Sequence, residues 1–421
     1  MYSFQVKKFS NGLRVLMVPS KESLSFEFSA LVNTGSDFEN KKNNGISHFL
    51  EHLCFKGTEK RKNNFEIAKE LDSIGASYNA FTSNEITGYY VKVAAPHFEK
   101  AIDMVSDIYL NSRFPLEEVE KERGVIQEEI KMYHDDPKSH IYDLWAKLLF
   151  GDQPAGWPVS GSINNVKKIK REEIIAYRDK QYRSKSTLII ISGNFNQKKI
   201  IDLVQQYFAS IKKGRGDKKQ AIKKITTPEV LLEYRPLKQT NFILGVYGLN
   251  VFDKRKYALE VLDAIFNGGM SGRLYQLVRE KLGAAYLVTS FDNYFTDRGE
   301  YGVIAGIDSD RIFVVKEILK ELMRFTTEKV SNQELKKAKD FITGRLSLSL
   351  ENVHHVAFNY GSQLILENKI ETPKEYLKKI KSVSASDILK VSRELFKPNA
   401  FKLAIIGPYK NKEAFYRLLK I

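Results

Sequence analysis

The chain has 421 residues, of which 43% are hydrophobic and 28% are charged, and its formal net charge is +16 at pH 7. This length exceeds what one hydrophobic core usually serves, and the ordinary balance of apolar and charged residues excludes a disordered or fibrous protein. No apolar run approaches the roughly 20 residues that a membrane-spanning helix needs. We therefore expect at least two globular domains and no membrane partner.

The positive charge raises the question of an acidic partner. Lysine is spread over the whole chain and rarely alternates with aromatic residues, so we expect no nucleic-acid partner. The densest basic run, 212–224, is typical of a solvated linker. The first residues lack the basic head and apolar core of a signal peptide, which predicts a cytoplasmic protein. Cys54 is the only cysteine, so no internal disulfide can form.

The first half of the chain contains both strand and helix patterns. Short runs that alternate between apolar and polar residues predict strands, and apolar residues that recur every three or four positions predict helices. An Asn-Gly pair at 11–12 marks a hairpin turn. The predicted strands are 4–9, 13–18, 26–32, 77–81, 87–94 and 187–192, and the predicted helices are 45–55, 64–74, 96–110, 115–134 and 172–181.

The second half repeats this order after the polar segment 212–228. Two local patterns, 166–170 and 188–193, recur about 210 residues later, at 377–381 and 403–407. Such a repeat favours a duplicated domain. The predicted strands here are 230–234, 241–249, 285–292 and 300–307, and the first predicted helices are 257–266 and 271–282.

These patterns predict an α+β fold of two similar domains. Each domain is expected to be a mostly antiparallel sheet with helices packed on it, because strands and helices come in runs rather than in strict alternation. The N-terminal domain would span 1–211, the linker 212–228 and the C-terminal domain 229–421.

The predicted helix 45–55 carries a His-x-x-Glu-His motif formed by His48, Glu51 and His52. Residues four apart lie on one helix face, so both imidazoles can reach one ion. The rest of the helix is apolar, which indicates that this polar stripe is buried and needs a charged partner. A chance grouping is the alternative, although the chain has only seven histidines. The motif therefore predicts a metal site with the carboxylate of Glu51 beside it.

A catalytic zinc site usually has three protein ligands, so a third one is required. The predicted helix 115–134 can supply it. In helical projection Glu122 and Glu129 flank the inward apolar stripe, whereas Glu128 points outward. The stripe consists of Val119, Ile126, Ile130 and Tyr133. Their position around the helix favours Glu122 and Glu129 over the neighbouring acidic residues as candidates for the third ligand. The alternative is that both are surface carboxylates on a charged helix.

Several segments resemble one family of enzymes. They are 45–58, 79–82, 122–129, 135–137 and 268–274. Through them nearly the whole chain resembles the inverzincin metallopeptidases related to pitrilysin, insulin-degrading enzyme and the mitochondrial processing peptidase, and it is most similar to the short bacterial members. The resemblance implies that His48, His52 and Glu129 hold one Zn²⁺ per chain, with Glu122 as a supporting catalytic residue.

The resemblance also implies how a substrate is bound. Asn79, Ala80 and Phe81 match an edge strand on which an extended peptide lies. Arg279 and Tyr286 match a pair that faces the zinc across a chamber and contacts the substrate carbonyl. Without the resemblance, a surface arginine and a core tyrosine would be the simpler interpretation. Active family members close two such domain pairs into a clamshell, so a chain of this length implies a homodimer.

The implied function is that of a zinc-dependent metalloendopeptidase of the processing-peptidase type. It would cleave unfolded peptides or presequence-like segments inside a closed chamber, with Glu51 as the general base. The alternative is a catalytically silent scaffold or a partner subunit of a heterodimeric peptidase. The presence of both the zinc motif and the Arg279–Tyr286 pair favours a self-sufficient enzyme. The remaining histidines that we considered, His97, His134 and His140, are expected to be structural or surface residues.

Overall fold

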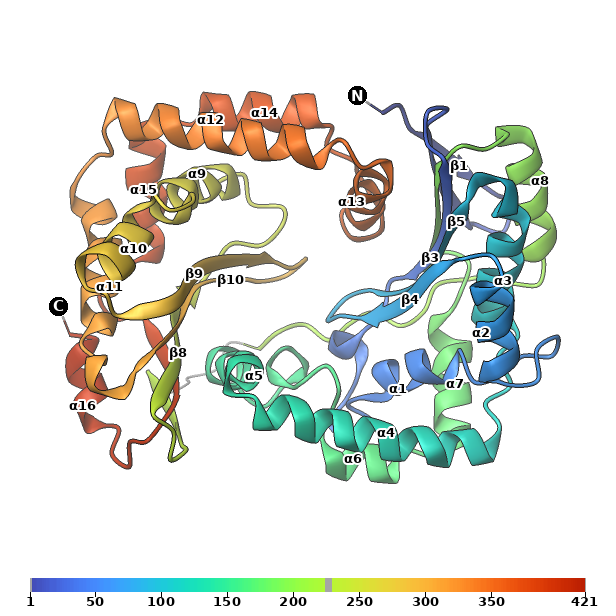
Figure 1. Cartoon of the computed structure of the whole chain (residues 1–421), viewed down its shortest axis with the longest axis horizontal. Coiled ribbons are helices and arrows are strands. Elements are labelled where there is room, and N and C mark those ends of the chain that lie inside the picture. Colours follow the sequence, from blue (N-terminus) through green and yellow to red (C-terminus); the bar gives the residue numbers. More distant parts are fainter. Residues whose placement is uncertain (1, 224–228, 421) are drawn as a thin grey trace. The chain divides into compact units, whose positions relative to one another are not determined.

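The computed structural model describes residues 2–223 and 229–420, except for the side chain of Tyr286 (Figure 1). By its contacts the chain divides into two units, and each is described here by itself. Unit 1 consists of Met1–Lys131, Trp157–Gln220 and Ser349–Ile370, and unit 2 consists of Met132–Gly156, Ala221–Leu348 and Glu371–Ile421.

The sheet of unit 1 has the strand order β1-β2-β6-β3-β5-β4. Strands β2 and β6 run parallel, and every other neighbouring pair is antiparallel. The strands are β1 (Gln5–Lys8), β2 (Arg14–Pro19), β3 (Ser25–Val32), β4 (Ser77–Thr82), β5 (Thr87–Ala94) and β6 (Thr187–Gly193).

Helices cover both faces of this sheet (Figure 1). Successive strand residues point to opposite faces, and in β2 the side chain of Met17 joins the core formed with α3, whereas Val18 packs in the core formed with α13. Both faces of the sheet therefore contribute side chains to a buried core. The helices of unit 1 are α1 (Ile46–Leu53), α2 (Asn64–Asp72), α3 (Phe98–Leu110), most of α4 (Leu116–Asp135), α6 (Ile163–Lys168), α7 (Arg171–Gln181), α8 (Gln197–Tyr207) and α13 (Val353–Leu366).

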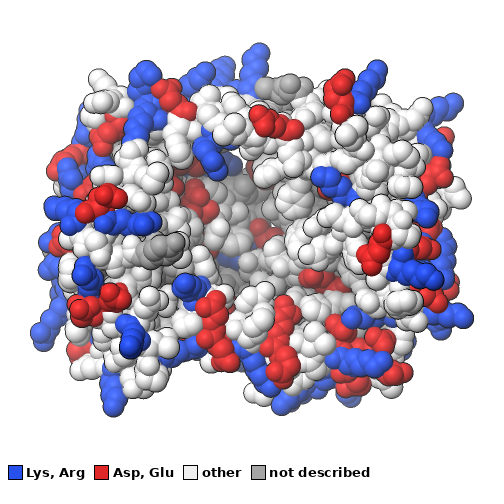
Figure 2. Space-filling view, in the orientation of Figure 1, with Lys and Arg blue, Asp and Glu red and all other residues white. Residues whose placement is uncertain are grey.

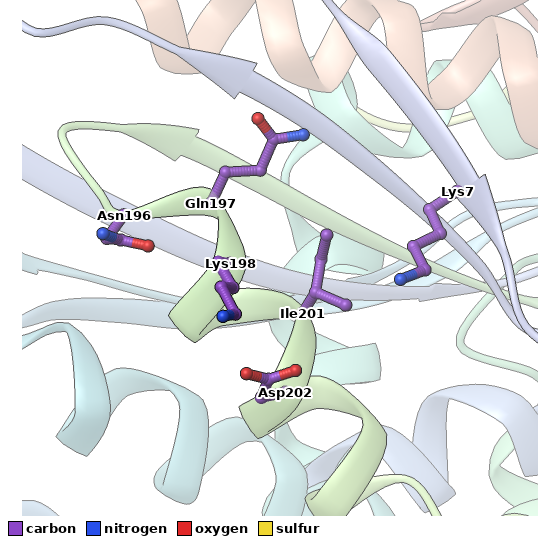
Figure 3. A pocket seen from close by; sticks show the side chains of 6 residues that line it. All are labelled: Lys7, Asn196, Gln197, Lys198, Ile201 and Asp202. Atoms are coloured by element: carbon purple, nitrogen blue, oxygen red, sulfur yellow. The ribbon is translucent and has the colours of Figure 1, made fainter.

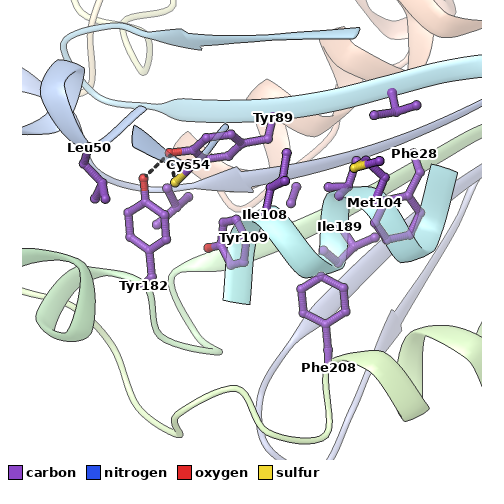
Figure 4. Packing of buried hydrophobic residues seen from close by; sticks show 14 of the residues in the cluster. Phe28, Leu50, Cys54, Tyr89, Met104, Ile108, Tyr109, Tyr182, Ile189 and Phe208 are labelled. Carbon is purple, nitrogen blue, oxygen red and sulfur yellow. Dashed lines mark hydrogen bonds between the residues drawn. The ribbon is translucent and has the colours of Figure 1, made fainter. Parts of the chain in front are cut away.

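A group of buried tyrosines lies between α1 and the sheet (Figure 4). The hydroxyls of Tyr89 and Tyr182 are 2.8 Å apart, and the Tyr109 hydroxyl lies 2.8 Å from that of Thr187. The Cys54 thiol donates to the Tyr89 oxygen at 3.5 Å, and burial raises the pKa of this thiol to about 11. Because these buried polar groups form hydrogen bonds with one another, the cluster can pack against α1 without leaving a polar atom unpaired among them.

Unit 2 repeats the topology of unit 1. Its strand order is β7-β11-β8-β10-β9, and the parallel pair is β7 with β11, as β2 pairs with β6 in unit 1. The strands are β7 (Val230–Tyr234), β8 (Gln239–Tyr247), β9 (Ala285–Tyr294), β10 (Gly299–Asp308) and β11 (Lys402–Gly407). The predicted α+β fold of two similar domains is thereby confirmed.

The helices of unit 2 include a short π-helical turn at Gln276–Lys281. The α-helices are α5 (Pro137–Phe150), α9 (Lys256–Asn267), α10 (Arg273–Tyr275), α11 (Val314–Thr327), α12 (Asn332–Ser349), α14 (Pro373–Ser382), α15 (Ala385–Leu395) and α16 (Glu413–Leu418). The repeated sequence patterns fall on equivalent elements, since 166–170 overlaps α6 and 377–381 lies in α14, while β6 and β11 carry the other pair.

Each half of the sequence contributes one helix to the sheet of the other half. Helix α5 packs on β11 and β8 in unit 2, where Trp145 donates to Glu300 at 2.7 Å, and α13 packs on β6 and β2 in unit 1. Helix α5 is not among the predicted helices, although Ile141, Trp145 and Leu148 follow helical spacing. The two units are therefore not continuous in sequence, in contrast to a single boundary at 212–228.

The basic segment that follows residue 211 differs from a solvated tether in its first part. Lys219 forms an ion pair with Glu85 at 2.5 Å, and its side chain is only 16% exposed. The backbone N–H of Gly216 donates to the Ser186 hydroxyl at 2.9 Å. These contacts hold the segment up to Gln220 against unit 1, and 224–228 lie outside the described residues.

The surface charges are interspersed. Figure 2 shows lysine and arginine side chains scattered over the face in view, with aspartate and glutamate among them. This agrees with the even spread of lysine along the chain. Within residues 2–223 and 229–420, no helix is both long and apolar enough to span a bilayer.

Three carboxyl groups of unit 2, those of Glu260, Asp263 and Asp292, are half-buried close to α9. Glu260 accepts a hydrogen bond from Tyr376 at 2.6 Å, and Asp263 accepts one from Tyr301 at 3.0 Å. Burial, together with the nearby Asp292 carboxyl, raises the pKa of Glu260 to about 7 and that of Asp263 to about 6. These groups hold their protons more tightly in the folded chain than in the unfolded chain.

We expect the free energy of unfolding of unit 2 to fall as the pH rises through the range of these pKa values. A carboxyl with a raised folded-state pKa contributes fully below its unfolded pKa and loses that contribution as the pH passes the folded pKa. The free energy of unfolding, measured with urea, should fall less steeply with pH in Asp263→Asn. The difference in slope should reach up to about 1.4 kcal/mol per pH unit between roughly pH 4 and 6. Asp308→Asn, at an exposed carboxyl, is the control. Equal slopes in all three proteins would contradict this prediction.

Candidate functional site

Helix α1 begins at a constrained backbone position. Gly45 has φ = 99°, and a Cβ there would lie 2.7 Å from the carbonyl oxygen of Ser160, so only glycine fits. The buried carboxylate of Glu39 accepts hydrogen bonds from the backbone N–H groups of Gly45 at 2.7 Å and Ser47 at 2.8 Å. Glu39 therefore caps the helix that carries the zinc motif. No sequence pattern indicates this role of Glu39, because its contacts with Gly45 and Ser47 form only when the intervening loop folds back.

The predicted metal ligands converge in the structure. The Nε2 atoms of His48 and His52 lie 3.2 Å apart on one face of α1. The Oε2 atom of Glu129, on α4, lies 3.7 Å from His48 Nε2 and 3.4 Å from His52 Nε2. Three potential donor atoms from two helices thus surround one point.

The bonding of these atoms fits a cation. The Nδ1 atom of His48 and the Oε2 atom of Glu129 are buried and make no hydrogen bond. Burial, and then the neighbouring His52, lowers the pKa of His48 to about 4. Two imidazole nitrogens and one carboxylate oxygen are a donor set suited to zinc and similar transition metals.

Glu122 supports His52 from the side away from Glu129. Its Oε2 atom lies 3.1 Å from His52 Nδ1, and its Oε1 atom lies 2.5 Å from the amine of Lys56. Burial opposes the effect, but the hydrogen bond with Glu122 and the nearby carboxylate of Glu129 raise the pKa of His52 to about 9. This contact orients the ring and leaves Nε2 facing the point of convergence.

Glu51 lies on the same helix but outside the set of converging donors. Its carboxylate accepts a hydrogen bond from the hydroxyl of Thr82, at the end of β4. Burial raises the pKa of Glu51, and this hydrogen bond only partly opposes the rise. A carboxylate that is more basic than a surface glutamate is suited to accept a proton.

Strand β4 is the end strand of the sheet of unit 1 and packs beside α1. Of the predicted substrate-binding residues, Ala80 packs against the core next to α1, whereas Phe81 contacts Phe358 of α13, with ring centroids 5.6 Å apart. Asn79 is exposed and accepts from the backbone N–H of Ala80 at 2.9 Å. The edge of β4 thus lies near Glu51, and Phe81 also has a packing role.

Arg279 and Tyr286 belong to unit 2, whereas the zinc motif belongs to unit 1. Arg279 lies in the π-helical turn, with its guanidinium 4.9 Å from the ring centre of Tyr275. Such turns interrupt α-helices and are frequent at functional sites. Tyr286 lies in β9, and its side chain is outside the described residues.

The prediction of which side chains of α4 face inward and which face outward is largely correct. Glu122 is 5% exposed and faces inward, and the side chain of Glu128 is 73% exposed and faces outward, as predicted. Tyr133 was placed on the inward stripe, and this prediction is wrong, since Tyr133 is 47% exposed. It lies beyond Lys131, where the helix leaves unit 1 and its core.

A separate hollow between β1 and α8 takes no part in this arrangement (Figure 3). In Figure 3 the side chain of Lys7 extends from β1 towards α8. The other lining residues are Asn196, Gln197, Lys198, Ile201 and Asp202. None of the predicted site residues lines it.

Comparisons with known proteins match most of the chain. Residues 15–162 match the family described as insulinase (peptidase family M16), and residues 168–341 match the peptidase M16 inactive domain. An uncharacterised zinc protease of Rickettsia felis is 33% identical over 96% of this chain and 98% of its own length. The uncharacterised zinc protease YmxG of Bacillus subtilis is 32% identical over 96% of this chain and 99% of its own length.

The fold is also shared with solved structures. The crystal structure of a protease from Helicobacter pylori superposes with a TM-score of 0.88, covers 97% of this chain and 100% of its own, and is 23% identical. The match to residues 15–162 contains both α1 and the part of α4 that carries Glu122 and Glu129. The chain therefore belongs to the insulinase family of peptidases, peptidase family M16.

Proposed function

We propose that the protein is a zinc-dependent metalloendopeptidase in which His48, His52 and Glu129 hold one zinc ion per chain. The observation that carries the proposal is the convergence of three donor atoms at a partly buried point, two of them imidazole Nε2 atoms that lie 3.2 Å apart. The names of the relatives in Rickettsia felis and Bacillus subtilis, both zinc proteases, support the choice of metal.

Glu51 is the proposed general base. When bound, zinc supplies a Lewis acid that polarises a peptide carbonyl and makes water a nucleophile near neutral pH. The carboxylate of Glu51 accepts the proton of the attacking water and then donates it to the leaving amine. Thr82 holds this carboxylate in place, and its burial keeps it basic.

The proposed substrates are unfolded peptides or presequence-like segments. Among the strands that the structure describes, β4 pairs only with β5, so a peptide in extended conformation can add backbone hydrogen bonds along the other edge of β4. Such binding depends little on side chains, which favours tolerance of sequence. Thr82 ends this strand and contacts Glu51, which would bring a peptide on Asn79 to Phe81 close to the base.

Arg279 and Tyr286 are proposed, on the family resemblance, to bind the substrate carbonyl and stabilise the negative charge that develops on its oxygen. The same resemblance underlies a homodimer that closes a chamber around the substrate. The π-helical turn that carries Arg279 is consistent with a functional position.

A catalytically silent subunit is the second candidate. The specific observation that favours it is the match of residues 168–341 to a domain described as inactive. That match covers the half without the zinc motif, whereas His48, Glu51, His52, Glu122 and Glu129 all lie within residues 15–162. The enzyme is therefore the better supported of the two.

Replacing the base should separate metal binding from catalysis. We expect Glu51→Gln to keep about one zinc per chain and to lower the hydrolysis of a quenched peptide library by about 10²–10⁴-fold, because only proton transfer is lost. Metal content by mass spectrometry and initial rates measure the two effects. Glu128→Gln, on the outward face of α4, is the matched control. Zinc-loaded native and Glu51→Gln proteins that are equally inert would support the silent subunit.

Removing the support of His52 should weaken metal binding. In Glu122→Gln we expect the zinc affinity to fall by about 10–100-fold, because the imidazole loses a charged partner that orients it. Competition with a fluorescent chelator measures this affinity. Glu117→Gln alters an exposed carboxylate of the same helix and should leave it unchanged. An unaltered affinity in Glu122→Gln would remove this residue from the proposed site.

The contribution of unit 2 can be tested at Tyr286. Tyr286→Phe should lower kcat by about 10²-fold with little change in KM or zinc content, because one donor to the developing oxyanion is lost. Steady-state kinetics with one quenched peptide measures both constants, and light scattering gives the oligomeric state. A normal kcat in a dimeric Tyr286→Phe protein would disprove this role.

A further inference from the structure

A second group of possible metal ligands lies in unit 2. His134 on α4, His140 on α5 and Glu233 on β7 each present a donor atom, and these atoms lie within 4.8 Å of one another. The Nε2 atom of His140 is 2.9 Å from Glu233 Oε2, and the ring centres of the two histidines are 4.5 Å apart. We propose that these three residues form a binding site for a divalent transition metal such as Zn²⁺, separate from the site on α1.

The backbone brings the two imidazoles together. Helix α4 ends at Asp135 and α5 begins at Pro137, so the chain turns a sharp corner. The Asp136 side chain caps α5 by accepting from the Lys138 N–H at 3.2 Å, and Pro137 suits the first helical turn. His134 in the last turn of α4 and His140 in the first turns of α5 therefore face each other across this corner.

The surroundings of His140 suit a ligand. Its side chain is 14% exposed, and its Nδ1 atom is buried without a hydrogen bond, 3.7 Å from Asp143 Oδ2. Nε2 lies 2.9 Å from Glu233 Oε2. When Nε2 binds a metal, Nδ1 carries the proton and can donate it to the nearby carboxylate of Asp143. Metal-bound histidines commonly have such a partner on the second nitrogen. Two imidazoles and a carboxylate are the donor types that zinc, copper and nickel prefer.

Arg235 limits the affinity of this site. Its Nε atom pairs with Glu233 Oε1 at 2.7 Å, and its Nη2 atom lies 3.4 Å from His134 Nε2. The carboxylate thus offers Oε1 to Arg235 and Oε2 to the proposed metal. The side chain of His134 is 56% exposed, so it is free to turn from the guanidinium to the metal. A positive charge this close weakens cation binding, so we expect a site weaker than that on α1.

Metal stoichiometry in the full-length protein tests the proposal. Equilibrium dialysis of metal-free protein against Co²⁺ or Zn²⁺, followed by mass spectrometry, should give two ions per chain for the native protein and one for His140→Ala or His134→Ala. His355→Ala, at an exposed histidine of α13, should still bind two. Because His134 is largely exposed, its variant is expected to fold, which circular dichroism checks. The count does not depend on peptidase activity, and loss of the α1 site in His52→Ala should leave one ion bound.

Affinity supplies the second measurement. In Co²⁺ titrations followed by visible absorption, His140→Ala should weaken the lower-affinity binding by more than about 100-fold, beyond the effect of losing an outer partner. Arg235→Gln should strengthen it by roughly tenfold, because a competing cation is removed. One ion per chain in native, His134→Ala and His140→Ala proteins alike would overturn the proposal and leave a plain ion-pair network of Glu233, His140 and Arg235. An unchanged affinity in Arg235→Gln would also count against it.

Discussion

The site depends on the burial of charged and polar side chains on an otherwise apolar helix. Helix α1 packs Ile46, Phe49, Leu50 and Leu53 into the core, which brings His48 and His52 out of water with it. Burying such groups is costly unless each has a partner. Glu122 supplies one partner for His52, and a cation at the point of convergence would supply the other. Glu39 at the start of α1 and the tyrosine cluster packed against α1 fix the position of this helix, and so the positions of His48 and His52.

Duplication explains the architecture around that helix. The order β2-β6-β3-β5-β4 of unit 1 recurs as β7-β11-β8-β10-β9 in unit 2, and both sheets are buried on two faces. The second face of each sheet is covered by a helix from the other half of the sequence, α13 or α5. Without this exchange, one face of each sheet would lose the helix that covers it. The zinc motif occurs in only one of the two copies, on α1.

Helix α4 links two groups of donors. It carries Glu122 and Glu129 in unit 1, and its last turn carries His134 in unit 2. Both groups combine two imidazoles with a carboxylate, but they differ in burial and in neighbouring charge. The residues of the α1 site are partly buried, and Glu122 contacts His52 and Lys56, whereas His134 is exposed and Glu233 is shared with Arg235. The same donor types can therefore serve different purposes according to their surroundings.

The strands, most helices, the α+β class, the His-x-x-Glu-His motif and the inward positions of Glu122 and Glu129 could all be predicted from the amino-acid sequence. These features depend on local periodicity, which the order of apolar residues expresses directly. Other features emerge only from the folded chain: the capping of α1 by Glu39, the contact of Thr82 with Glu51, the exchange of α5 and α13, the exposure of Tyr133, and the proximity of His134 and His140 to Glu233. Each of these joins residues across a loop or from distant elements, or depends on where a helix leaves its core, and no local pattern encodes such a relation.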